Sequence, residues 1–214
     1  MTTIIAQKLT LKQIHQLLKL HKLPNGSFTP LLSLEPLTEF EQQELTQIRD
    51  DFENYLIEGK VLEGQIKLLV IAPLLRLAGF YRSPIKISLE QDIETIVVED
   101  EDTKITGRFD LLAVNKEYAT TKDIAFWLLV IESKNSSINS LEGLPQLLTY
   151  AHQSLKYQKL VWGLSTNGTD YRFVLIKPGN PPTYQQMPLL DLMDSESAVL
   201  LLQVLKSICK QQNL

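Results

Sequence analysis

Three segments of the chain place an acidic residue two positions before a lysine, a spacing that phosphodiester chemistry can use. They are Glu58-Gly-Lys60, Asp102-Thr-Lys104 and Glu132-Ser-Lys134. Phosphodiester cleavage needs a cation held by hard oxygen ligands and a group that orients or activates water. The third segment stands out because Glu132 directly follows the apolar stretch 124–131, where a carboxylate is rarely left unpaired.

A simple strand pairing brings a second carboxylate, Asp110, beside Glu132. The stretches 105–114 and 124–134 both have the composition of strands, and 124–131 suits a central strand that is buried on both faces. An antiparallel hairpin with Asp110 opposite Glu132 has its turn near Thr121, inside the polar segment 115–123. Opposite residues share a sheet face, and the two-residue period adds Lys134 to that face. The pattern therefore predicts that two carboxylates and a lysine surround one site.

The elements around this hairpin predict an α/β protein in which helices flank a mixed central β-sheet. Apolar periodicity and capping patterns predict helices at 9–23, 38–59, 61–77, 145–157 and 195–211. Strands are predicted at 85–89, 93–98, 160–164 and 171–176, with turns at 99–102 and 165–170. Within the third helix Pro73 predicts a kink, and Gly79 is placed to end it.

These residues resemble the PD-(D/E)XK nucleases. The family's core motif is similar to Gly107-Arg-Phe-Asp110 followed by Val130-Ile-Glu-Ser-Lys134, with Gly107 where proline is usual. Leu62-Glu63, before a helix that ends at Gly79, resembles the helix that supplies the family's first acidic residue. Gln146-Leu-Leu-Thr-Tyr150 matches the Q-x-x-x-Y motif of the helicase-linked branch.

A fourth segment narrows the resemblance to the N-terminal nuclease domain of type I restriction enzyme R subunits. Residues 164–172 look like the Thr-Asn-Gly hairpin of those enzymes. The resemblance covers about residues 58–176, and the G-x-x-x-x-G-K-[ST] motif of a helicase motor is absent from the sequence. It implies a restriction-endonuclease-like core that cleaves DNA by in-line attack of water, with Mg²⁺, or Mn²⁺ in its place, as cofactor.

The resemblance also implies roles for individual residues. Asp110 and Glu132 would bind the metal together with the backbone carbonyl of Ser133, and Lys134 would orient or activate water. Glu63 would bind a second metal or its water shell. Two residues would position the substrate, namely Gln146 and Tyr150, which lie one helical turn apart.

Plainer interpretations of the same residues exist. Asp110 could pair with Arg108 or Lys134, and Glu132 could form an ordinary ion pair with Lys134. Glu63 could form an i,i+4 salt bridge with Lys67. Gln146 and Tyr150 could simply cap and cover a helix. The alternative function that fits these interpretations is a restriction-endonuclease-like module that binds nucleic acid or assembles with other proteins, with little or no turnover.

Composition places this chemistry in an ordinary globular chain. The 214 residues are 44% hydrophobic and 21% charged, and we expect an N-terminal helical segment (1–57), a nuclease-like core (58–190) and a closing helix (191–214). The apolar stretch 68–79 is too short for a membrane span, the N-terminus lacks a secretory pattern, and Cys209 is the only cysteine. These features predict a cytoplasmic protein without disulfides.

The formal charge of −4 bears on the partners of the chain. A protein that binds nucleic acid only by neutralising phosphates is usually basic, so tight non-specific binding by this chain alone is not expected. DNA is the expected substrate, although RNA would use every residue named above. A protein partner or a second copy of the chain could supply affinity or target choice.

Overall fold

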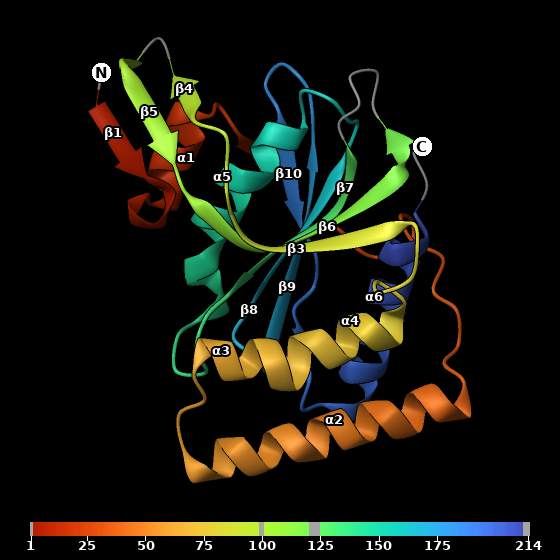
Figure 1. The fold of residues 1–214 in the computed structure, drawn as a ribbon. Coiled ribbons are helices and arrows are strands. Elements are labelled where there is room, and N and C mark those ends of the chain that lie inside the picture. The colour runs from red at the N-terminus through yellow and green to blue at the C-terminus, as the bar shows by residue number, and fades with distance from the viewer. Residues whose placement is uncertain (1, 99–100, 120–124, 212–214) are drawn as a thin grey trace.

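The centre of the fold is a mixed β-sheet, shown in Figure 1. The structure is a computed structural model that describes residues 2–98, 101–119 and 125–211. Within these residues, eight strands form the sheet; seven follow the order β2-β10-β9-β8-β7-β6-β3, and β11 also pairs with β9. The bounds are β2 His21–Lys22, β3 Ile85–Asp92, β6 Arg108–Ala119, β7 Ala125–Ser133, β8 Val161–Thr166, β9 Asp170–Lys177, β10 Thr183–Gln186 and β11 Leu190–Asp191.

A second sheet, in the order β1-β5-β4, has β1 Thr2–Ile5, β5 Thr103–Thr106 and β4 Ile96–Val98. The single strand predicted at 105–114 is therefore wrong, because the chain leaves one sheet after β5 and enters the other at β6. Gly107 lies at this change, and a Cβ there would stand 2.8 Å from the ring of Tyr150. Only glycine lets the backbone pass so close to that ring.

Both sheets take a strand from the N-terminal segment. Strand β1 pairs with β5 and strand β2 pairs with β10, each in parallel. The segment 1–57 thus contributes strands as well as helices, and its separation from residues 58–190 as a domain stays a prediction. Part of the turn predicted at 99–102 lies outside the described residues.

The predicted helices are present. They are α1 Leu11–Leu17, α2 Glu39–Glu58, α3 Glu63–Ile66 continued by the π-helical turn η2 Lys67–Ile71 and α4 Ala72–Ala78, α5 Leu144–Ser154, and α6 Ser195–Lys210. Short 3-10 turns are η1 Ala6–Lys8 and η4 Ser140–Gly143. The first helix is shorter than predicted, since it ends at Leu17 and residues His21–Lys22 form strand β2. The capping box predicted at Thr38 and Glu41 is formed, and Asp194 caps α6.

The sequence predicts a kink at Pro73, and the structure has the π-helical turn η2 directly before α4, the helix that contains this proline. The N–H of Ala72 bonds to the carbonyl of Lys67, five residues earlier. Proline has no N–H and its ring crowds the preceding helical turn, so a wider turn relieves both problems without ending the helix. The helix then ends at Gly79 as predicted, and this glycine adopts φ 99°.

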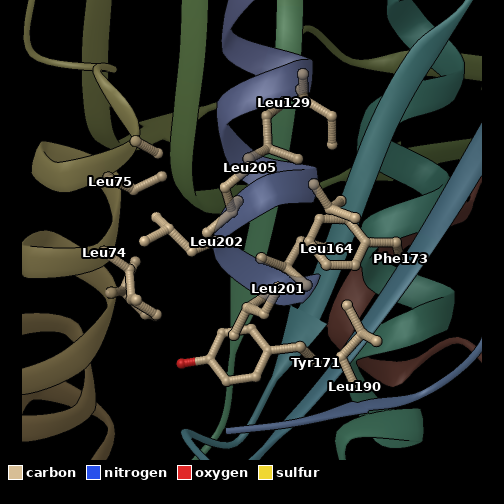
Figure 2. Close-up of a cluster of buried hydrophobic side chains, with 14 of the residues drawn as sticks. Leu74, Leu75, Leu129, Leu164, Tyr171, Phe173, Leu190, Leu201, Leu202 and Leu205 are labelled. Atoms are coloured by element: carbon tan, nitrogen blue, oxygen red, sulfur yellow. The ribbon is translucent and has the colours of Figure 1, made fainter. Parts of the chain in front are cut away.

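Helices cover both faces of the large sheet. Helix α5 packs on strands β7 and β8 and also contacts α1. On the other face α4 and α6 pack together, and α2 contacts both from outside. Figure 2 shows Leu201, Leu202 and Leu205 of α6 between the leucines of α4 and the side chains of the sheet. The predicted α/β architecture, a mixed central sheet flanked by helices, is confirmed. No helix in the described ranges is long and apolar enough to span a membrane.

Candidate active site

The pairing of β6 with β7 places the two predicted carboxylates together. Leu111 lies opposite Ile131 and Leu112 opposite Val130, in antiparallel register. Continuing this register by one residue sets Asp110 opposite Glu132, as the sequence predicts. The register shifts further along the hairpin, between Ala113 and Val114 and beyond Asn115. The turn predicted near Thr121, together with Ile124, lies outside the described residues.

Asp110 is held by donors from two other elements. Its Oδ2 accepts hydrogen bonds from the backbone N–H of Ser133 at 2.6 Å and from the Ser133 hydroxyl at 3.0 Å. Its Oδ1 lies 2.9 Å from the ammonium of Lys67. Neither partner considered in the plainer interpretation is used, since Arg108 lies 3.7 Å from Glu90 and Lys134 pairs with Glu132. Ser133 therefore orients Asp110 through its N–H and hydroxyl groups. The role of its backbone carbonyl as a metal ligand stays a prediction.

Glu132 is the most deeply buried charged residue of the site. Its side chain is 1% exposed, and Oε1 lies 2.5 Å from the Lys134 ammonium. The second oxygen, Oε2, is buried and has no hydrogen-bond partner among the described residues. A Cβ on Gly143 would stand 3.0 Å from Cγ of Glu132. Glycine at that position therefore lets the chain before α5 close over the carboxylate.

Burial disfavours the ionised form of the Glu132 carboxylate. Loss of solvent, followed by the nearby negative charge of Asp110, raises the pKa of Glu132 to about 8, while Lys134 acts in the opposite direction. A buried carboxylate with one unsatisfied oxygen is stabilised when a cation reaches it. The site therefore has the electrostatic character of a carboxylate centre that needs more positive charge than Lys134 supplies.

Helix α5 brings its two predicted residues to the site. Gln146, in the first turn, is buried, and its Oε1 accepts a hydrogen bond from Nζ of Lys134 at 3.3 Å. Tyr150 is fully buried one turn later and packs against Gly107, three residues before Asp110. Burial, and then the charge of Glu132, raises the pKa of Tyr150. Gln146 thus holds the Lys134 ammonium, whereas Tyr150 supports the backbone that leads to Asp110.

The π-helical turn η2, which continues α3, begins with Lys67, a residue whose role the sequence did not reveal. Lys67 lies 2.8 Å from Oε1 of Glu63, the i,i+4 pair of the plainer interpretation, and it also bonds to Asp110. Burial lowers the pKa of Lys67, but the hydrogen bonds to Glu63 and Asp110 outweigh that effect and the pKa is raised. The spacing of Glu63 and Lys67 was visible in the sequence. The contact across to Asp110 was not, because it depends on where the helix crosses the sheet.

These positions define what could hold a metal. Across residues 2–98, 101–119 and 125–211, no three Asp, Glu, His or Cys side chains stand close enough together to hold an ion. Glu63 is separated from Asp110 by the Lys67 ammonium. The group that fits a hard divalent cation is the pair of Asp110 and Glu132, with the unsatisfied Oε2 as a donor.

Part of this chain is similar to solved structures. The sequence matches no family model and no curated protein. A solved fragment described as an HsdR subunit of a type I restriction enzyme from Vibrio vulnificus YJ016 is similar to 67% of this chain, with 18% sequence identity and a TM-score of 0.39. The match covers 26% of that chain, so this chain spans about a quarter of its length.

Proposed function

We propose that this chain is a Mg²⁺-dependent nuclease of the PD-(D/E)XK type that cleaves DNA. The observation that carries the proposal is the buried carboxylate of Glu132, which lies opposite Asp110 in the sheet. One of its oxygens bonds to Lys134, and the other has no partner in the described part of the chain. A buried carboxylate beside a second, partly exposed carboxylate is costly to maintain for stability alone, even with an ammonium next to it. The same arrangement is suited to holding a cation against a phosphodiester.

In this proposal each residue has a separate task. A bound Mg²⁺ would neutralise charge on the phosphate and make a water molecule more acidic. Asp110, oriented by Ser133, and Glu132 would hold the ion through hard oxygen atoms. Lys134, steadied by Gln146, would hold the attacking water by its ammonium.

Two further residues act at the edge of this centre. Tyr150 keeps the backbone before Asp110 in place through its packing on Gly107. Glu63 is 42% exposed and can reach water or substrate at the mouth of the site. We place both among the residues that position the reacting groups.

A second candidate function is a nucleic-acid-binding module without turnover. One observation favours it: both oxygens of Asp110 already have partners, Lys67 on one side and Ser133 on the other. In such a module the ion pairs would be structural. Metal-dependent cleavage would then be absent from the wild-type chain.

The test is cleavage of single-stranded, duplex and branched DNA and of RNA with Mg²⁺ or Mn²⁺. Lys134→Ala should lower the rate by at least ~100-fold, because it removes the group that holds the water. The matched control is Lys104→Ala, since Lys104 belongs to another acid-x-Lys segment and is exposed on β5. Equal cleavage by the wild type, Lys134→Ala and Lys104→Ala would refute the proposed centre. No cleavage by any of these proteins would favour the binding module. The nucleic acid that the wild type cleaves identifies the substrate class.

A further inference from the structure

One ammonium at the site is surrounded by carboxylates from three separate elements. Nζ of Lys67 lies 2.8 Å from Glu63 on α3, 2.9 Å from Asp110 on β6 and 3.8 Å from Glu90 on β3. Glu90 in turn lies 3.7 Å from Arg108. The Lys67 side chain is 23% exposed, so the ammonium is enclosed rather than free in solvent. Three carboxylates thus surround the Lys67 ammonium in the way that carboxylates surround a bound metal ion.

The position of this ammonium relative to Glu132 is informative. Asp110 presents Oδ1 to Lys67, and its register on β6 sets it opposite Glu132 on β7. Asp110 would thus contact two positive charges. One is the cation that the proposed function places at Asp110 and Glu132, and the other is the Lys67 ammonium between Asp110 and Glu63. Sites with two metal ions that cleave phosphodiesters have this plan, with the ions ~4 Å apart and a carboxylate between them.

We propose that Lys67 is a tethered substitute for a second metal ion. The inference rests on the proposed function and deepens it: the centre takes one divalent cation at Asp110 and Glu132, and the Lys67 ammonium fills the place between Glu63, Glu90 and Asp110. A covalently attached charge does not dissociate, and it needs no free ion in solution.

The proposal makes Lys67 the residue that sets metal stoichiometry. Without its ammonium, Glu63, Glu90 and Asp110 would face one another with no counter-charge between them. As they stand around the ammonium, these three carboxylates are too far from one another to hold an ion. Without the ammonium between them they could close on Mg²⁺ or Mn²⁺, which carboxylate oxygens bind. Removing one lysine should therefore create a cation site instead of destroying one.

The experiment is a count of Mn²⁺ ions bound by the full chain, measured from free Mn²⁺ by electron paramagnetic resonance and by titration calorimetry. Wild type should bind one ion, and Lys67→Met, which keeps the apolar stem, should bind two. Glu63→Gln in the Lys67→Met background should return the count to one. Lys86→Met is the matched control, because it removes the same charge from β3 at an exposed position and should leave one site.

Three results would overturn the inference: two ions in the wild type, an unchanged count in Lys67→Met, or no binding in either protein. Lys67→Arg, which keeps the charge, should still bind one ion and serves as a folded reference if Lys67→Met unfolds. Two bound ions together with cleavage by the wild type would reject only the role of Lys67. No bound ion and no cleavage would reject the proposed nuclease as well.

Discussion

At the scale of single residues, the unsatisfied oxygen of Glu132 leads to a measurable effect of metal on stability. A ligand that binds only the folded state stabilises it by about 2.7 kcal/mol at a concentration 100 times its dissociation constant. We therefore expect saturating Mg²⁺ to raise the melting temperature of the wild type by several degrees, and to leave Glu132→Gln nearly unchanged. Glu58→Gln, at an exposed acid of another acid-x-Lys segment, should keep the full shift. An equal shift in all three proteins, measured by circular dichroism, would show that the ion binds elsewhere.

Cys209 offers a pH-linked prediction outside the site. Burial raises the pKa of its thiol from 9.0 to about 11. Because the thiolate is the reactive form, its fraction at pH 8 should fall by ~100-fold compared with an ordinary cysteine. Labelling by an aromatic disulfide reagent at pH 8 should be slow in the native chain and become fast in denaturant. Native labelling at the denatured rate would contradict the burial, and Cys209→Ser supplies the blank.

The pair of Asp110 and Glu132 could be predicted from the sequence, whereas the contact of Lys67 with Asp110 could not. Asp110 and Glu132 are brought together by a local hairpin, and period-two alternation then adds Lys134 to the same face. Lys67 reaches Asp110 from a helix 43 residues earlier. No periodicity encodes such a contact, since it depends on how helix and sheet pack. The i,i+4 spacing to Glu63 was the single local sign of it.

At the scale of elements, the turn between β8 and β9 depends on a glycine. Gly168 adopts φ +95°, and a Cβ there would stand 2.6 Å from Cζ of Phe52 on α2. Gly168→Ala combines backbone strain with a steric clash, so we expect a loss of about 2–4 kcal/mol in the free energy of unfolding. The measurement is urea unfolding followed by circular dichroism.

A matched glycine controls for the change of residue type. Gly64 lies in helix α3, and a Cβ there would meet nothing within 4 Å. Gly64→Ala should be neutral or stabilising by up to ~1 kcal/mol, because alanine favours the helix. A similar loss in both variants would mean that the contact with Phe52 does not set the cost.

Elements with local signals were predictable, and those fixed by distant contacts were not. The capping box of Thr38 and Glu41 begins α2 as the sequence predicts, and Gly79 ends α4. The change of sheet at Gly107 escaped prediction because the apolar pattern continues through it. The Tyr150 ring, which requires glycine at this position, comes from a helix much later in the chain.

At the scale of the whole molecule, two hydrophobic cores share the large sheet. Trp162 belongs to the core that contains α4 and α6, and Trp127 packs against the core that contains α5. Strands that contribute to both cores should couple them into one cooperative unfolding transition. In Trp127→Phe and in Trp162→Phe, the fluorescence of the remaining tryptophan should follow the same urea curve as circular dichroism. A fluorescence midpoint that departs from circular dichroism in either variant would reveal independent unfolding of one core.

The parallel pairing of β2 with β10 has a consequence for how the protein is made. His21 pairs with Thr183, so a growing chain on the ribosome carries the first partner long before the second is synthesised. The hairpin with Asp110 and Glu132, in contrast, can form as soon as residue 133 has emerged. Helix α6, whose leucines pack against side chains of the sheet in Figure 2, follows much later. The order of the elements thus allows the two carboxylates to meet before helix α6, the last layer over the leucines of the sheet, has been synthesised.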